Sequence, residues 1–178
     1  MIIIGNRDWH KSIIEVPCPA QMVEDARVDA EKLGELRNSI TKGQSNIFGK
    51  LGERIAHDVL QGDYADTYDY DIVLPSGVRV DVKSKRVKGQ PFPYFSCNVA
   101  SYNTRQDCDA YVFVRVSDNL SRGWVLGWYP KKKFYEDAEF RAKGTADESN
   151  GHVEHCDSYR LLASQLFNVD DLPSWERV

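Results

Sequence analysis

The sequence predicts one mixed α/β domain in which a large part of the sheet is antiparallel. Its 178 residues fall within the usual size of a single domain with a buried core. Up to Leu60 the chain favours helices, because helix-forming residues are frequent and apolar residues recur at helical spacing. After Gly62 polar and apolar residues alternate, which is typical of strands. Helices, then a run of strands, then a last helix indicate a mixed fold.

Each expected element follows from its local pattern. In chain order we expect a strand at 12–16, helices at 22–36 and 46–60, strands at 68–74, 78–83, 94–99, 110–116 and 124–128, a helix at 131–142 and a strand at 159–162. Segment 110–116 is almost entirely apolar, so we expect it at the centre of the sheet, covered on both faces. We treat 1–178 as a single domain with its core at about 38–144, a helical extension before it and an irregular one after it.

Composition excludes several classes of protein. Apolar residues make up 42% and charged residues 28% of the chain, which excludes a disordered tail, a coiled coil and a fibrous repeat. Apolar runs are too short for a membrane span or a secretion signal, so we expect a cytoplasmic protein without a membrane partner. The net charge of −4 argues against non-specific binding to nucleic acid, although local clusters can override it. Without CxxC pairs, the cysteines are expected to be buried thiols: Cys18, Cys97, Cys108 and Cys156.

The segment 68–85 predicts a hairpin. A type I turn fits here, because Pro75 presets the backbone and Gly77 supplies the left-handed residue that follows. A three-residue loop with a bulge at glycine pairs Leu74 with Val78. In that register the valines of the second strand face the core, and its charged residues face the other side.

The predicted register brings charged side chains together. Asp71 lies across from Asp81, and Asp69 lies across from Lys83. Two opposed carboxylates repel each other unless a cation separates them, and Mg²⁺ prefers carboxylate oxygens. Lys83 would then lie beside the ion, where an ammonium can orient water or stabilise charge on a phosphate. The alternative is that these residues form solvated ion pairs at strand edges, which contribute little.

A further carboxylate lies on the preceding helix. Glu53 is surrounded by the small residues Gly49 and Ala56 at the edge of the polar face, which allows close approach to a neighbouring sheet. The core stripe of this helix has i, i+4 spacing and consists of Ile47, Leu51, Ile55 and Val59. A single helical glutamate is more often simply exposed, so Glu53 matters only in combination with the hairpin.

Together, Glu53, Asp71 and Asp81-Val82-Lys83 resemble the motif of the PD-(D/E)XK nuclease superfamily: a helix with Glu, a strand with Asp, then a strand with Asp or Glu, any residue, and Lys. Gly49-Lys-Leu-Gly-Glu53 is similar to the Gly-rich helix signature frequent in that superfamily. Short segments also resemble uncharacterised nuclease-like proteins of phages: Asn38-Ser-Ile40, Gly52-Glu53, Tyr68-Asp-Tyr-Asp71, Val82-Lys83 and Leu126-Gly-Trp128. Tyr70 departs from the pattern, which often has proline before the first Asp.

The resemblance implies a restriction-endonuclease-like core, with a mixed central sheet flanked by helices, and a DNA nuclease, expected to be an endonuclease, that uses Mg²⁺ or Mn²⁺. Asp71, Asp81 and the Val82 carbonyl would bind the metal, and Glu53 would hold a second ion or a water on the first. Lys83 would position the attacking water, and in-line displacement would leave a 5′-phosphate and a 3′-hydroxyl. Many relatives are dimers, so a homodimer is permitted, in a bacterial or phage-infected cell.

Basic residues follow this candidate site. Lys85, Arg86 and Lys88 are expected to contact DNA phosphates, which would give sequence-independent and salt-dependent affinity. The second basic run, 131–133, is more simply a solvated helix start. The late cluster of His152, His155 and Cys156 is only a weak match to a zinc site, because no second ligand pair lies at suitable spacing.

Two other functions stay open. A nuclease-like fold could hold DNA or a partner protein without cutting, and in a structural protein the same charges would be surface ion pairs. The complete Glu, Asp, Asp and Lys set favours catalysis, because a retired site need not keep all four. Polar residues on the next strand and loop could touch the substrate, although their spacing does not require it: Asn98, Asn103 and Gln106.

Overall fold

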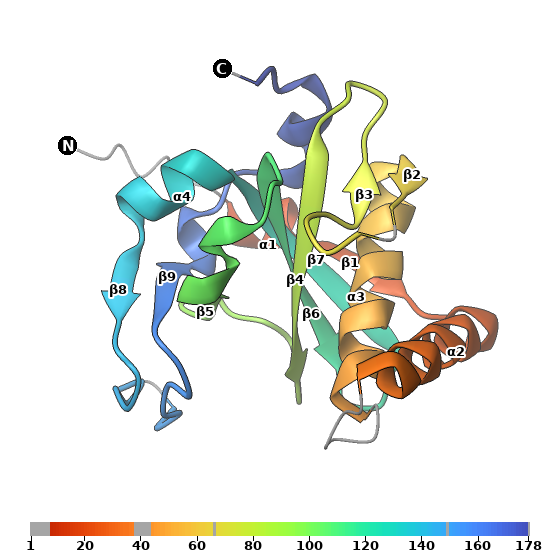
Figure 1. The fold of residues 1–178 in the computed structure, drawn as a ribbon, viewed down its shortest axis with the longest axis horizontal. Coiled ribbons are helices and arrows are strands. Elements are labelled where there is room, and N and C mark those ends of the chain that lie inside the picture. Colours follow the sequence, from red (N-terminus) through yellow and green to blue (C-terminus); the bar gives the residue numbers. More distant parts are fainter. Residues whose placement is uncertain (1–7, 38–43, 66, 149, 178) are drawn as a thin grey trace.

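The computed structural model describes residues 8–37, 44–65, 67–148 and 150–177. A large twisted sheet occupies the middle of the molecule, with long helices on one side and a smaller sheet on the other (Figure 1). The Asn38-Ser-Ile40 segment, part of the basis for the phage resemblance, lies outside the described residues.

The larger sheet is mixed. Its strands lie in the order β1-β7-β6-β4-β3-β2, with the bounds Ile14–Pro17 (β1), Arg122–Pro130 (β7), Ala110–Ser117 (β6), Arg79–Val87 (β4), Ile72–Val73 (β3) and Asp63–Tyr64 (β2). β4 and β6 run parallel, and the other neighbours in this sheet are antiparallel. The connection from β4 to β6 passes through the smaller sheet.

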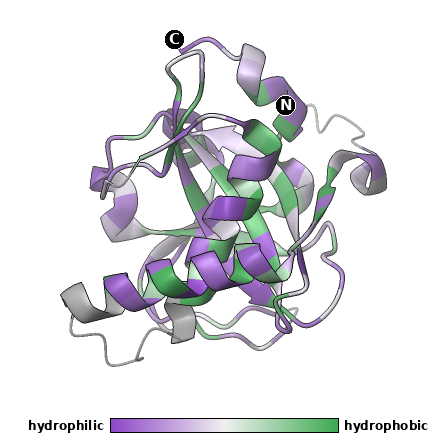
Figure 2. Ribbon diagram, turned by 90° about the vertical axis from the view of Figure 1, so that its right-hand side faces the viewer, coloured by the Kyte–Doolittle hydropathy of each residue, from purple (hydrophilic) through white to green (hydrophobic). Residues whose placement is uncertain are grey.

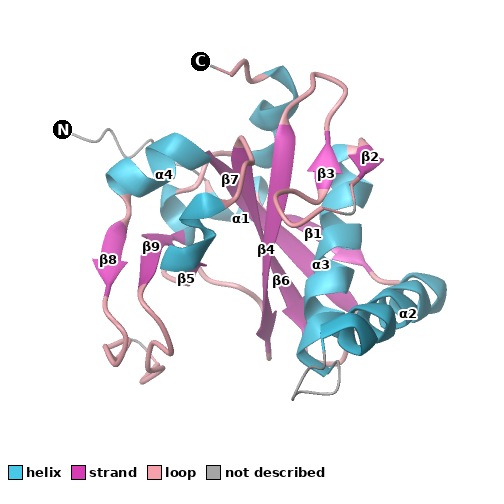
Figure 3. Ribbon diagram, in the orientation of Figure 1, coloured by secondary structure: helices cyan, strands magenta, loops and turns pink. Residues whose placement is uncertain are grey.

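The smaller sheet is antiparallel and lies beside the larger one (Figure 3). Its order is β5-β9-β8, with the bounds Ser96–Ala100 (β5), Ser158–Leu162 (β9) and Glu139–Arg141 (β8). The helices are α1 (Trp9–Ser12), α2 (Ala20–Arg37), α3 (Gln44–Leu60) and α4 (Lys131–Asp137), with 3-10 turns η1 (Ser101–Arg105), η2 (Ala163–Gln165) and η3 (Val169–Ser174).

The two faces of the larger sheet carry separate hydrophobic cores. On one face α3 packs against the sheet, with buried Leu51 opposite strand residues such as Val112. On the other face the smaller sheet and α4 cover a core that includes Tyr111, Phe134 and Leu161. Seen from the side of α2, the strands are largely hydrophobic and the outer face of the helix is largely hydrophilic (Figure 2). The mixed α/β class, with a mixed central sheet and flanking helices, is therefore confirmed.

β6 has the central place that its apolar sequence predicts. All of its residues are buried, and it lies between β7 and β4. Val112 and Val114 belong to the core under α3, whereas Tyr111 and Phe113 belong to the core under the smaller sheet. Because successive side chains point to opposite faces, an apolar residue at almost every position fits a strand covered on both sides.

The close approach of α3 to the sheet depends on Gly52. A Cβ atom built on Gly52 would lie 1.7 Å from Ser84 Oγ of β4, whereas one built on Gly49 would meet nothing within 4 Å. The expected close approach to the sheet is therefore present, but it occurs at Gly52, which the prediction did not name, and not at Gly49.

The hairpin has the predicted turn and register. Gly77 has a φ of +84°, the left-handed conformation that glycine adopts without strain. The Leu74 amide donates to the Val78 carbonyl at 2.9 Å, and Ile72 pairs with Val80. Continued by one residue, this register sets Asp71 opposite Asp81.

The first strand of the hairpin is shorter than predicted. β3 covers only Ile72–Val73 in place of 68–74, so no ladder reaches Asp69. The Asp69 carboxylate accepts a hydrogen bond from the Asp107 amide at 3.0 Å, and the predicted pairing of Asp69 with Lys83 is wrong. Alternating polarity alone did not show that the chain leaves the sheet at Asp71.

The last third of the chain contains a second departure. The helix expected at 131–142 ends at Asp137, and the chain continues as β8. The Phe140 ring is 53% exposed and contacts Tyr159 on β9, so it packs across a strand pair and not along a helix. No described helix is long and apolar enough to cross a membrane.

Candidate active site

The candidate site forms where β3 and β4 separate. The Asp71 amide donates to the Val80 carbonyl at 2.8 Å, which is the last backbone contact of this kind before the strands diverge. Beyond this point the Asp71 side chain, and not a backbone carbonyl of β3, pairs with β4: its Oδ2 accepts a hydrogen bond from the Val82 amide at 2.7 Å. Asp71 is thus fixed against β4 by both its backbone and its carboxylate.

The Val82 carbonyl faces the same side as Asp71. In a strand, the amide and the carbonyl of one residue point toward the same neighbour. Since the Val82 amide meets Asp71, the Val82 carbonyl also points to the edge of β4 that β3 has left. The sequence-based assignment of this carbonyl as a candidate ligand is compatible with that direction.

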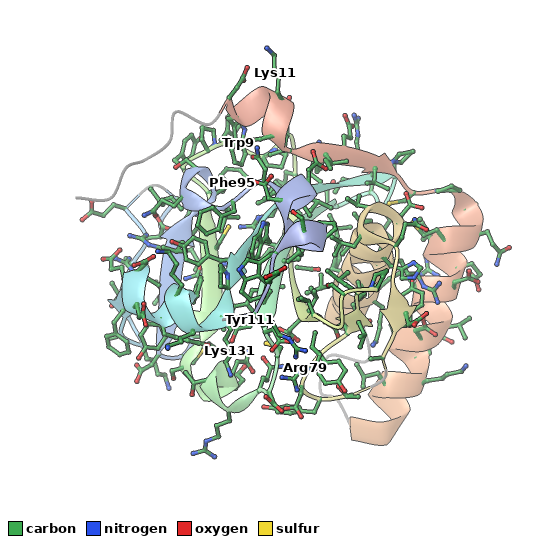
Figure 4. All side chains as sticks on the ribbon, turned by 90° about the horizontal axis from the view of Figure 1, so that it is seen from above. Trp9, Lys11, Arg79, Phe95, Tyr111 and Lys131 are labelled. Carbon is green, nitrogen blue, oxygen red and sulfur yellow. The ribbon has the colours of Figure 1, made fainter. Side chains whose placement is uncertain are left out.

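Asp81 and Lys83 lie on the face of β4 opposite α3. The Lys83 ammonium is 2.7 Å from Asp81 Oδ2 and lies over the ring of Tyr111, 5.6 Å from its centroid. Figure 4 shows Tyr111 at the same end of the molecule as Arg79, the first residue of β4. Asp81 is only 5% exposed, so its carboxylate is a buried charge that needs polar partners.

Gln106 joins the two charged residues. Its Oε1 accepts a hydrogen bond from Lys83 Nζ at 3.1 Å, and its Nε2 donates to Asp81 Oδ1 at 3.3 Å and to the Tyr68 carbonyl at 2.9 Å. The Lys131 ammonium holds Gln106 in turn by donating to its backbone carbonyl. Sequence reasoning identified Gln106 only as a possible substrate contact, because its position after η1 gives no signal of a contact with β4.

Glu53 reaches the same region from α3. Its carboxylate forms an ion pair with Lys50 Nζ at 3.1 Å, one helical turn earlier. Both side chains are 22% exposed. The close contact of Gly52 with Ser84 brings this turn of the helix onto β4. The charges of Glu53, Asp71 and Asp81 act on one another's pKa, and Lys83 contacts Asp81, so the four residues singled out by sequence lie in one region.

Burial raises the pKa of all three carboxyl groups, and repulsion from neighbouring carboxylates adds to the shift for Asp71 and Glu53. Burial raises the pKa of Asp71 to about 8, and the charges of Glu53 and Asp81 add to the shift. The pKa of Glu53 is raised by burial and also by Asp81, although Lys50 counteracts part of the effect. Burial raises the pKa of Asp81 despite the nearby Lys83 ammonium. Such a group of carboxylates is unfavourable for folding and favourable for binding a cation.

The donor set fits a hard divalent cation. Among the described residues, no group of three or more His, Cys, Asp or Glu side chains is arranged to hold a metal ion. Mg²⁺ needs fewer, since it keeps several waters and is commonly bound by one or two carboxylates. Asp81 Oδ2 is buried and lies 2.7 Å from the Lys83 ammonium. That atom, the Asp71 carboxylate and the Val82 carbonyl are all oxygen donors at one strand edge.

The predicted DNA-contacting residues continue along the same strand. Lys85 and Arg86 lie on β4 and Lys88 follows it, and all three border one cavity. Arg86 is 3.8 Å from Asp118, so part of its charge is offset by a neighbouring carboxylate.

The late histidine cluster does not form a metal site within the described residues. The rings of His152 and His155 pack edge to face at 5.5 Å, which is an ordinary aromatic contact. The cysteines are all free thiols. Cys18, Cys97 and Cys108 are buried as expected, whereas Cys156, also expected to be buried, is only partly buried.

Comparison with known proteins adds no assignment: no protein-family model matches the chain, and neither does any curated protein.

Proposed function

We propose that the chain is a DNA nuclease, expected to be an endonuclease, that depends on Mg²⁺ or Mn²⁺ and has a restriction-endonuclease-like core. The observation that carries the proposal is the junction of β3 and β4, where Asp71 and Asp81 lie opposite each other and Lys83 lies beside Asp81. Carboxylates buried next to one another are unfavourable without a cation. An ammonium at the same place suits the negative charge of a phosphate.

In this proposal each residue has a distinct role. Asp71, Asp81 and the Val82 carbonyl would hold the ion, which when bound polarises a phosphodiester and lowers the pKa of an attacking water. Lys83, held by Asp81 and Gln106, would orient that water and balance the charge that develops on the phosphate. Glu53 would exchange its Lys50 partner for a second ion or a water.

The sheet supports the same proposal at a coarser level. β4 carries the Asp-Val-Lys sequence and pairs in parallel with the fully buried β6, so the strand with two of the charged residues is supported by the buried centre of the sheet. Catalytic groups on a supported strand keep their geometry better than groups on a loop.

The test is metal-dependent cleavage of supercoiled plasmid by the wild type and by Asp81→Ala. We expect nicking with Mg²⁺ or Mn²⁺, none with EDTA and none with the variant. Asp107→Ala is the matched control, because Asp107 is an exposed carboxylate whose ion pair is with Arg79.

The outcomes separate the functions that the sequence left open. Metal binding and DNA binding without cleavage of any DNA form would favour a binding module. The absence of both cleavage and calorimetric metal binding would exclude the nuclease.

A further inference from the structure

A cavity of about 600 Å³ lies between the two sheets, further along β4 than the candidate active site. It is bordered by the last part of β4, by Arg115 of β6, by β5 with the aromatic segment before it, and by the segment that leads into β9. Its volume is in the range of sites that hold a small organic group.

The floor of the cavity carries positive charge. Arg115 is 4% exposed, and its guanidinium donates to the Ser96 and Val114 carbonyls, while no described carboxylate forms an ion pair with it. Lys85 is the register partner of Arg115 on β4, and its ammonium donates to Asn98 at 2.8 Å. A buried cation without a counter-ion is costly, and an anion entering the cavity would remove that cost.

The environment of the Lys85 ammonium lowers its pKa. The Lys85 side chain is partly accessible to water at the cavity. Desolvation by the surrounding protein and, to a smaller extent, the charge of Arg115 together lower the pKa of its ammonium to about 8. The charges of Glu154 and Asp147 raise this pKa, but by less than desolvation and the Arg115 charge lower it.

The two carboxylates in the cavity are already engaged. Asp147 accepts a hydrogen bond from the Ser96 hydroxyl at 2.9 Å and lies 3.7 Å from Arg160. Glu154 accepts hydrogen bonds from Asn98 at 3.0 Å and from Ser158 at 3.2 Å. The ion pair of Asp147 is with Arg160, which lies outside the cavity lining, and the lining contains more basic than acidic side chains, so positive charge is in excess in the cavity.

Aromatic rings stand at the mouth of the cavity. The rings of Tyr94 and Phe92 are stacked with their centroids 5.4 Å apart and their planes within 6°. They are 54% and 48% exposed, respectively, and Phe95 supports both with edge contacts. Another planar group can extend such a stack, and exposed pairs of large aromatic side chains commonly mark a binding surface.

The cavity and the candidate active site share one face of β4. Lys83 and Lys85 are two residues apart, so their side chains point to the same face, about 7 Å apart along the strand. A polymer held at Lys83 can therefore place its next unit beside Lys85.

We propose that this cavity receives one unpaired nucleotide of the DNA substrate, with a phosphate near Lys85 and Arg115 and the base stacked on Tyr94. The inference rests on the proposed nuclease function and names its substrate class as DNA with a single-stranded stretch, end or extruded base. A simple anion site would not need exposed stacked rings, and an apolar site would not need a buried arginine beside a lysine. A nucleotide is the unit that uses both. Enclosure between two sheets leaves room for one base and not for a duplex.

The test is binding of a fluorescent twelve-residue oligothymidine in EDTA, measured by anisotropy with full-length protein. Tyr94→Ser and Lys85→Gln are expected to weaken binding about tenfold each, the size typical of losing one stacked base or one phosphate contact. Phe140→Ser and Lys132→Gln are the matched controls, since each removes an exposed ring or charge outside the cavity, and their binding should stay within twofold. Melting temperatures confirm that all four variants fold.

Two comparisons complete the test. A blunt duplex of the same length should bind more weakly than the single strand and should not respond to Tyr94→Ser. Equal losses on duplex and single strand would overturn the proposal, and so would tighter binding of free thymidine monophosphate than of the oligomer.

The two experiments distinguish an incorrect cavity assignment from an incorrect nuclease proposal. If Asp81→Ala abolishes plasmid cleavage while Tyr94→Ser binds oligothymidine like the wild type, the nuclease stands and the cavity assignment is wrong. If no DNA is cut under any condition but the Tyr94 and Lys85 variants lose binding selectively, the cavity assignment stands without the nuclease.

Discussion

The carboxyl group of Asp71 is partly buried, so its charged form lacks much of the solvation that it would have in water. Its pKa is about 8 in the folded state and near 3.8 in an unfolded chain. Between these values the folded protein holds a proton that the unfolded chain has lost, so this residue makes stability fall as pH rises from about 4 to about 8. The residue therefore opposes folding at neutral pH, which is typical of groups kept for function.

We expect Asp71→Asn to raise the free energy of unfolding by about 1–2 kcal/mol at pH 8 in EDTA, and by progressively less toward pH 4, while abolishing cleavage. Urea unfolding at several pH values measures the difference. Asp109→Asn should have the opposite sign: burial works against ionisation of Asp109, but hydrogen bonds from Arg79 outweigh it and keep its pKa below the usual value. An Asp71→Asn protein that is less stable than the wild type at pH 8 would contradict this account.

In the proposed nuclease we expect Gln106 to act through its neighbours, because its side-chain amide is engaged by Lys83, Asp81 and the Tyr68 carbonyl. Gln106→Leu removes the hydrogen bonds that hold Asp81 and Lys83 while keeping a similar volume. We expect kcat for DNA cleavage to fall by about 10- to 100-fold with KM nearly unchanged, because a misplaced ammonium affects the chemical step more than binding. The pH profile should shift as well, since Asp81 loses a hydrogen bond to its charged form. A loss confined to KM would contradict a positioning role, and Thr104→Ala, an exposed residue of the same 3-10 turn, is the neighbouring control.

At the level of elements, α3 and β4 meet at one point that tolerates no side chain. We expect Gly52→Ala to lower the free energy of unfolding by about 1–3 kcal/mol, because its Cβ would overlap Ser84. Gly49→Ala should instead be neutral or stabilising by about 0.5–1 kcal/mol, since nothing lies within 4 Å of the new Cβ and alanine favours a helix. Thermal or urea unfolding distinguishes the two glycines.

A double mutant tests whether Ser84 is the cause. Gly52→Ala combined with Ser84→Gly should recover most of the lost stability, because the clashing side chain is gone. Additive losses in the double mutant would show that the effect of Gly52→Ala arises elsewhere.

The hairpin was predictable from sequence and its surroundings were not. The turn residues fix φ and the loop length, so local chemistry alone determined which residue faces Asp81. The end of β3 depends on where the chain finds other partners, as Asp69 does with Asp107, and alternation does not encode that. β8 was likewise missed, because its residues continue the helix-like pattern expected at 131–142. Their pairing with β9 depends on the path of the chain, which that pattern does not encode. Gln106 contacts Asp81 and Lys83 because of the course that the chain takes after η1, and no local pattern in the sequence predicts that course.

At the scale of the whole molecule, the mixed sheet separates a helix-covered core from a core under the smaller sheet. Asp81, Lys83 and the cavity beside Lys85 lie along β4, the strand next to the central β6. A net charge of −4 opposes binding of DNA to the whole surface, so binding has to depend on local charge and on a cation at the carboxylates. Binding of that cation should be visible as a change in the stability of the entire fold.

We therefore expect Mg²⁺ or Mn²⁺ to raise the melting temperature of the wild type, and to raise it more at pH 8 than at pH 6. The ion has to displace protons from raised-pKa carboxyl groups such as that of Asp71, so its affinity increases as these groups ionise. The shift grows with ion concentration as RT ln(1 + [M]/Kd), which is about 2.7 kcal/mol at one hundred times Kd. Sodium chloride at equal ionic strength should not reproduce it, and Asp81→Ala should remove it. An equal shift in Asp81→Ala would place the bound ion elsewhere, and a shift that does not change with pH would show that these carboxyl groups do not exchange protons for the metal.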